Sequence, residues 1–233
     1  MFRADLVGAL DSLTPPRLPR PARSFPSLYE MLRPKDRLDN ELIRALVGRS
    51  VNVELVSVFI DLSRLCAALD YAVAHGVTVH PQAFDEDTTC IQHDLLRILP
   101  RNSTGIEGAC TLAALVFIQT FTKEAPFSGA DTSANAFVAQ RLRASLESST
   151  TEEGGEPLIF WIYLIGAMAS QQTSEEGWFR QKLCRLRTEY LPISTWTFAE
   201  DGLKKILWSP TIHSTIGQRV WEDQLNSLIP VGL

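Results

Sequence analysis

The sequence has few of the residue patterns that indicate catalysis or metal binding. Its four cysteines are far apart and form no Cys-x-x-Cys pair, so no disulfide framework is indicated and we expect a reducing compartment. Gly-x-Ser-x-Gly, Gly-x-Gly-x-x-Gly and phosphate-loop motifs are absent. We therefore expect no enzymatic activity and assign no catalytic, cofactor-binding or metal-binding residue.

Long apolar runs and a strong excess of one charge are also absent. The longest apolar run, residues 158–169, would span about 18 Å as a helix, less than the ~30 Å hydrocarbon layer. It predicts a buried helix, and we expect no membrane contact. The formal net charge of −5 is uneven, because residues 1–37 hold seven basic and four acidic residues, which leaves about −8 for the remainder. An acidic body does not favour direct binding to nucleic acid.

The N-terminal region differs in composition from the rest of the chain. Residues 14–26 are rich in proline and arginine, which favours extended conformations and removes backbone hydrogen-bond donors. We interpret residues 1–37 as a flexible, disordered Pro/Arg-rich leader. Residues 38–233 are expected to form one folded domain.

The remainder has the periodicity of helices. In residues 52–75, for example, apolar residues recur at intervals of three and four, and no segment alternates convincingly with a period of two. The sequence therefore predicts an all-α fold, a single helical bundle of about nine helices. The expected helices are 40–47, 52–75, 85–99, 106–121, 134–146, 157–169, 174–190, 197–209 and 215–228.

Local signals set several helix ends. Gly76 is expected to end one helix, and Pro157 to lie in the first turn of another. Ser174 is expected to be an N-cap, while Thr197 and Glu200 have the spacing of a capping box. Pro210 is expected to end the helix that follows Thr197.

Cys90 and His93 are the best candidates for metal ligands, because a spacing of three places both on one helical face. His75 or His80 could supply a third ligand. A structural zinc site needs four ligands, usually in two close pairs, and the second pair is missing. We favour the alternative of a packed thiol beside a surface imidazole.

The three consecutive acids Asp85, Glu86 and Asp87 could suggest a divalent-cation or acid–base cluster. Consecutive residues on a helix point in different directions, however, so we interpret them as a solvated helix start. Replacement of Glu86 is accordingly expected to have little effect on the fold.

Basic residues near Trp178 and Tyr190 resemble a surface for phosphate or nucleic acid. We expect them on the exposed side of their helix, because residues 179, 183, 186 and 190 form its apolar stripe. Cys184 lies among these cations without a nearby histidine, so nucleophilic catalysis is not indicated. The cations are Arg180, Lys182, Arg185 and Arg187.

Five tryptophans punctuate the last third of the chain, and we expect them to anchor helices to a common core rather than to line a ligand pocket. They are Trp161, Trp178, Trp196, Trp208 and Trp221. This series resembles the end of the regulatory domain of fungal zinc-cluster transcription factors. Residues 90–99 and 107–117 are similar to two preceding helices of that family, so the resemblance covers about residues 40–228.

The resemblance implies a nuclear transcription-regulatory domain, with the cytoplasm as a second location. It implies contacts with the transcription machinery or co-regulator proteins, and it is compatible with a homodimer and a small-molecule effector. The family's Cys-x2-Cys-x6-Cys module is absent, so none of its zinc ligands can be transferred and no DNA reader is expected. The chain would be a shortened relative or the product of a gene model that starts too late. The alternatives are a helical small-molecule-binding module and an enzyme with an unrecognised site.

Overall fold

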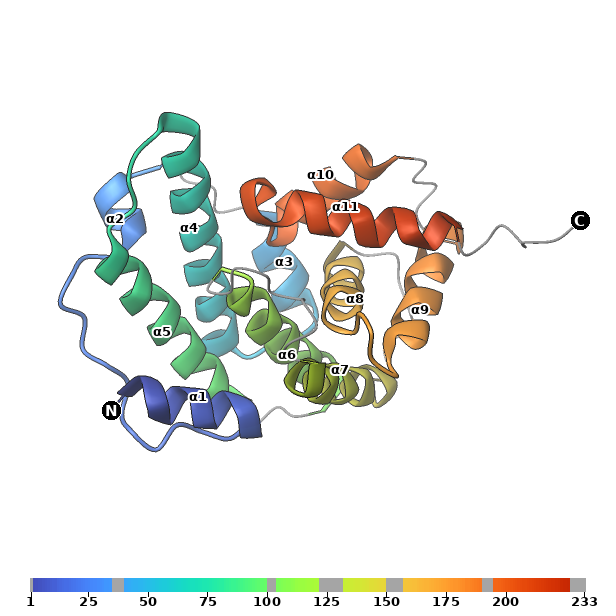
Figure 1. The fold of residues 1–233 in the computed structure, drawn as a ribbon, viewed down its shortest axis with the longest axis horizontal. Helices are drawn as coiled ribbons and strands as arrows, with labels where there is room; N and C mark the ends of the chain where they lie inside the picture. The colour runs from blue at the N-terminus through green and yellow to red at the C-terminus, as the bar shows by residue number, and fades with distance from the viewer. Residues whose placement is uncertain are drawn as a thin grey trace, which may run out of the picture.

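The computed structural model describes residues 2–34, 40–99, 104–121, 132–149, 157–189 and 195–226. Over those ranges the chain contains eleven α-helices and no strand, arranged as a single helical domain (Figure 1). The predicted all-α class is confirmed. The helices are α1 (Phe2–Ser12), α2 (Leu28–Leu32), α3 (Asn40–Gly48), α4 (Val53–His75), α5 (Pro81–Ile98), α6 (Gly105–Gln119), α7 (Thr132–Glu147), α8 (Pro157–Ala169), α9 (Glu176–Glu189), α10 (Trp196–Ile206) and α11 (Pro210–Asn226).

The two helices beyond the predicted nine both lie in the leader. α1 packs against α5, and α2 packs against α4 and α5. Leu6 and Leu28 from these helices are buried in the same apolar core as the rest of the domain. The prediction of a disordered leader is therefore wrong for residues 4–34, and residues 35–37 lie outside the described part of the chain.

Several predicted helix ends are confirmed by the backbone. Asn52 caps the start of α4 through its side chain, and Gly76 ends α4 with a left-handed φ of 63°. Pro157 is the first residue of α8. In each case a short-range signal decides the end, because the cap satisfies backbone groups that the helix itself cannot.

Other helix ends differ from the prediction. α5 begins at Pro81 with His80 as its N-cap, so residues 85–87 lie one turn inside the helix. α9 begins at Glu176, two residues after the expected N-cap Ser174. α10 begins at Trp196, so Thr197 lies inside the helix and the predicted capping box is wrong; Thr195, which precedes α10, makes no side-chain cap. Pro210 opens α11, which was expected to start at Thr215. A proline at the first helical position loses no hydrogen bond, so it starts a helix as readily as it follows one.

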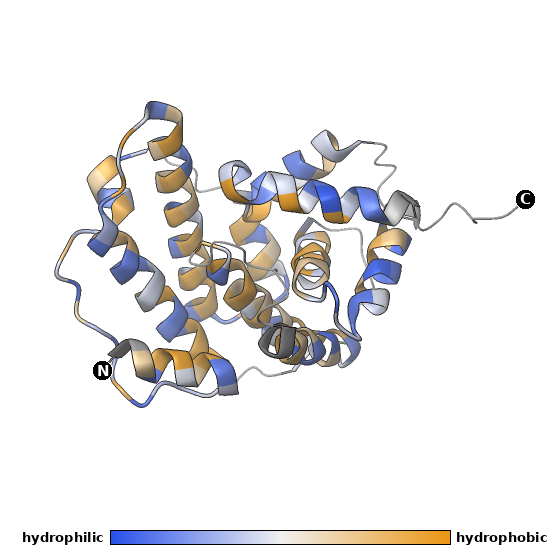
Figure 2. Cartoon of the chain, viewed as in Figure 1, coloured by the Kyte–Doolittle hydropathy of each residue, from blue (hydrophilic) through white to orange (hydrophobic). Residues whose placement is uncertain are grey.

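α8 is the centre of the core. Every residue from Leu158 to Ala169 is buried, and Figure 2 shows this helix as apolar around its circumference. The Trp161 ring contacts Phe59 of α4 and Phe117 of α6, with centroid separations of 5.6 and 5.8 Å. None of the described helices has the length and apolar character needed to cross a bilayer.

The tryptophans divide into two groups. Trp161, Trp208 and Trp221 are at most 2% exposed, which confirms the expected anchoring role for these three. Trp178 and Trp196 are half-buried at the edge of the same core. Trp196 packs edge-on against Trp208 and joins α10 to the segment before α11.

Candidate functional site

The most distinctive site of the molecule is an extended segment bound along one helix. Residues 17–27, here called the strap, belong to the connection between α1 and α2 and run beside α5 (Figure 1). Within residues 15–26 no backbone group bonds to another backbone group of the described residues. The backbone N–H groups that bond do so to carboxylate side chains, so the strap is held as a bound peptide would be.

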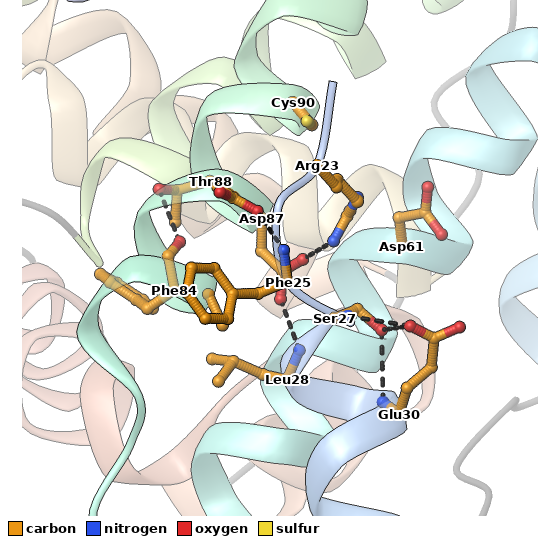
Figure 3. Close-up of polar contacts among 12 residues, drawn as sticks. Arg23, Phe25, Ser27, Leu28, Glu30, Asp61, Phe84, Asp87, Thr88 and Cys90 are labelled. Atoms are coloured by element: carbon orange, nitrogen blue, oxygen red, sulfur yellow. Dashed lines mark hydrogen bonds and ion pairs between the residues drawn. The ribbon is translucent and has the colours of Figure 1, made fainter. Parts of the chain in front are cut away.

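The first turns of α5 hold the C-terminal half of the strap. The Glu86 carboxylate accepts hydrogen bonds from the backbone N–H groups of Ser24 and Phe25 at 2.9 and 3.0 Å. Asp87, which is 4% exposed, accepts the Leu28 N–H at 2.9 Å through one oxygen and pairs with Arg23 through the other (Figure 3). Bonds to ionised groups are stronger than neutral ones, so this end is firmly held.

The later turns of α5 hold the N-terminal half. Arg20 pairs with Asp94 at 2.8 Å, and His93 Nε2 lies 3.2 Å from the Leu18 carbonyl oxygen. The Cys90 thiol donates to the Pro21 carbonyl at 3.9 Å. These partners follow each other along α5 at helical spacing while the strap runs in the opposite direction.

Chain geometry explains why the two elements match. Arg20 and Arg23 are three residues apart, which is about 9 Å in a polyproline-type chain. Their partners Asp94 and Asp87 are seven residues apart, which is about 10.5 Å along a helix and returns to the same face. An Arg-x-x-Arg segment therefore fits two acids spaced by seven on a helix.

The environment of the strap keeps Arg23 and Glu86 ionised and the Cys90 thiol neutral. Burial acts to lower the pKa of Arg23, but its hydrogen bond to Asp87 and the charge of that carboxylate outweigh burial, and the pKa is raised. Desolvation acts to raise the pKa of Glu86, but the Phe25 and Ser24 N–H groups outweigh it, and the pKa is lowered. Burial raises the pKa of the Cys90 thiol, which therefore stays protonated at neutral pH and serves as a weak donor.

A cleft of about 400 Å³ lies between the strap, α2, α4 and α5. Its arginines and acids are equal in number, and its arginines make ion pairs, including Arg64 with Asp61 at 3.4 Å. Burial raises the pKa of Asp61, and the nearby Arg64 opposes that effect. The cleft is polar and charge-balanced, so it suits charged side chains better than an apolar ligand.

The structure places the metal candidates in separate roles. Cys90 and His93 both face the strap, whereas His80 caps α5 and His75 bonds to the Tyr71 carbonyl at the end of α4. Among the described residues, no three His, Cys, Asp or Glu side chains form a group that could hold a metal ion.

The interpretation of residues 85–87 as a solvated helix start is wrong for Glu86 and Asp87. Because α5 begins four residues earlier than expected, these acids face the strap rather than the helix N-terminus. The sequence signal that could have found the site is the spacing of Glu86, Asp87, Cys90, His93 and Asp94 on one face of α5.

The basic strip of α9 is dispersed over different partners. Phe179, Leu183 and Leu186 are buried as expected, and Tyr190 lies outside the described residues. Arg180 pairs with Glu176 at 2.7 Å. Lys182 lies over the Trp178 ring and Arg187 over the Trp221 ring, while Cys184 is half-buried and Arg185 is exposed.

A buried polar cluster, which the sequence did not indicate, joins α4, α6 and α11. His213 Nε2 lies 2.6 Å from the Thr120 hydroxyl, and its Nδ1 accepts from the Ser209 N–H at 3.3 Å. The Ser209 hydroxyl donates to Asp70 at 2.6 Å, not to His213, so this is not the geometry of a nucleophile with its base. Burial lowers the pKa of His213 to about 3 and keeps the ring neutral.

Comparison with known proteins adds no relative to this description. No protein-family model, curated protein or solved structure matches the chain.

Proposed function

We propose that this chain is a transcription-regulatory helical domain that acts through protein contacts and has no DNA-binding module of its own. The observation that carries the proposal is the acidic face of α5, which binds an extended Arg- and Pro-containing segment through its carboxylates. This is a mode of peptide recognition, built on a rigid helix. The tryptophan series resembles that of fungal zinc-cluster regulators. On the basis of this resemblance, we propose that the protein contacts serve transcription and take place in the nucleus.

The chemistry of the strap site favours contact over catalysis. Its cations form ion pairs with carboxylates, and its cysteine is a protonated thiol in contact with a carbonyl. Catalytic sites instead hold a nucleophile or a base within reach of an open position. Co-regulator proteins are therefore the partners we propose.

A small-molecule effector is a second candidate because of the cleft beside the strap. Its volume of about 400 Å³ lies within the range of ligand pockets. Its charged lining would select a polar or zwitterionic compound. Native mass spectrometry of the purified chain tests this candidate, which predicts one stoichiometric compound bound in repeated preparations.

A tethering assay tests the proposed function. The full chain is fused to an unrelated DNA-binding domain, and transcription of a reporter with the matching site is measured in fungal cells. We expect a change in reporter output of several fold relative to the DNA-binding domain alone, in either direction, and a nuclear signal for a fluorescent fusion of the chain. An unchanged reporter at matched nuclear protein levels would contradict the proposal.

A further inference from the structure

The strap covers a surface that has the properties of a peptide-docking site. Asp87 is buried, and Glu86 and Asp94 are positioned on the same face of α5 by the regular geometry of the helix. Such a surface is already formed before a ligand arrives, so little ordering is needed to bind one.

The features of the strap that α5 contacts are not unique to this segment. Its contacts are two guanidinium groups spaced by three residues, backbone N–H groups at Ser24, Phe25 and Leu28, and two carbonyl oxygens. Every extended polypeptide with an Arg-x-x-Arg spacing can present this set. The identity of the residues between the arginines matters little, and Ala22 is exposed.

The strap itself is held mainly by polar contacts that water can replace. The buried apolar anchors Leu13 and Leu28 lie outside the strap on either side, whereas Leu18 and Phe25 within it are only half-buried. The Arg20 side chain is 45% exposed. The Arg20–Asp94 pair therefore contributes little, because exposed charges gain little over their hydrated state, whereas the more buried Arg23–Asp87 pair holds the other end more firmly.

We propose that the acidic face of α5 is a docking site for an extended segment of a partner protein that carries two arginines three residues apart, and that the strap is its resident competitor. This inference rests on the proposed role in protein contact and names the chemistry of the partner. A partner whose segment adds a further cation could also reach Asp61 in the adjoining cleft, which the strap does not contact through a hydrogen bond or ion pair.

A second copy of the chain is a less favourable occupant. Its strap would offer the same contacts that the tethered strap already makes at a high effective concentration. Exchange between copies would therefore gain no contact and would cost the freedom of two molecules. A different protein with a better-fitting or more basic segment does not have this disadvantage.

A peptide-binding experiment tests the proposal. The probe is a fluorescent peptide with the sequence of residues 14–28, and its anisotropy is measured with the wild-type full chain and with the Arg20→Ala/Arg23→Ala full chain. The double substitution weakens the strap and frees the face of α5, so we expect it to bind the peptide at least about tenfold more tightly than the wild type. Affinity should fall as salt is raised, because the contacts are ionic.

Two matched controls define the site. A peptide in which both arginines are alanine should bind the double variant at least about tenfold more weakly than the parent peptide. Adding Glu86→Gln and Asp94→Asn to the double variant should remove binding to a similar extent. Equal binding of the two peptides, or no loss on neutralising the acids, would overturn the proposal.

The folding of the variants must be followed, since Arg23→Ala leaves Asp87 without its cation. The single variant Arg20→Ala keeps that pair and should show a smaller gain in peptide affinity, about threefold. Absence of peptide binding by variants that keep the wild-type circular dichroism and melting would overturn the proposal. So would dimers of the wild-type chain that disappear on Arg20→Ala/Arg23→Ala substitution, because a second copy would then be the occupant.

The outcome is separable from that of the tethering assay. If the fusion changes reporter output and the peptide does not bind, the docking site is wrong and the contact role stands. If the peptide binds but the reporter is unaffected, the docking site stands and the role in transcription is wrong.

Discussion

His213 is a titratable residue that is fully enclosed by the core, next to aromatic rings. It is 0% exposed, stacks on Phe117 at 4.4 Å and contacts the Trp208 ring. Its Nδ1 accepts the Ser209 N–H, so Nε2 carries the proton and donates to Thr120, whose hydroxyl in turn donates to the Phe117 carbonyl. Nδ1 also lies 3.1 Å from the Ser209 carbonyl oxygen, which favours the charged ring, but burial outweighs this contact and keeps the ring neutral.

Stability should therefore depend on pH through His213. Its pKa is about 3 in the folded chain and about 6.5 when unfolded, so below pH 6.5 the unfolded state takes up a proton that the folded state does not. The free energy of unfolding should fall by about 2 kcal/mol between pH 7 and pH 5. Urea unfolding at each pH measures this. A His213→Gln variant with the same pH dependence as the wild type would contradict the assignment.

The buried tryptophans give a second prediction at the residue scale. Trp161 is 0% exposed and Trp208 is 2% exposed, so replacement of either by alanine leaves a large cavity. We expect a loss of about 3 to 5 kcal/mol in the free energy of unfolding for each, measured by chemical denaturation. Replacement of the exposed Phe198 serves as the control and should cost far less. Melting temperatures within a degree or two of the wild type for both tryptophan variants would show that the core is assigned incorrectly.

At the scale of elements, α8 and α9 approach closely at Gly166. A Cβ atom at this position would overlap the ring of Phe179. Gly166→Ala should therefore destabilise the fold by about 1 to 3 kcal/mol, because a packed core cannot give way to an added methyl group without strain. Gly202 within α10 has open space around it, so Gly202→Ala should instead stabilise by up to about 1 kcal/mol. Thermal unfolding of the two variants measures the contrast, and equal shifts in one direction would contradict this packing.

The sequence predicted elements well where local patterns decide them. The glycine after His75 and the proline at position 157 mark ends that the structure confirms, because caps and prolines act within a few residues. α2 carries a full capping box between Ser27 and Glu30, which could have been recognised but was hidden by the surrounding prolines. The partner of the strap could not be predicted, because the bonds from Glu86 to Ser24 and Phe25 span about 60 residues of sequence.

The strap and α5 form one unit at the scale of elements, and Glu86 joins them without contributing to the central core. Glu86→Gln should weaken the two bonds to Ser24 and Phe25 and loosen the strap, while the melting of the helical body changes little. Limited proteolysis with trypsin, which can cleave after Arg23, measures the first effect. Unchanged cleavage rates in this variant would mean that Glu86 does not hold the strap.

For the whole molecule, helical periodicity predicted the fold class, whereas composition led to a wrong prediction for the leader. A segment rich in proline and arginine forms no internal hydrogen-bond ladder, which is why it was expected to be disordered. In the structure several of its backbone N–H groups bond to carboxylates of α5, and those of Arg17 and Leu18 bond to Asp5 of α1. Composition indicates whether a segment can form hydrogen bonds within itself, but it does not indicate which distant residues the segment will contact in the folded chain.

Amide hydrogen exchange of the strap in the intact chain tests the central claim most directly. The N–H groups of Ser24, Phe25 and Leu28 should exchange at least about tenfold more slowly than in the free peptide of residues 14–28, because each is bonded to a carboxylate of α5. The protection of Ser24 and Phe25 should be lost in the Glu86→Gln chain while that of α8 persists. Exchange of all three at free-peptide rates in the wild-type chain would contradict a bound strap.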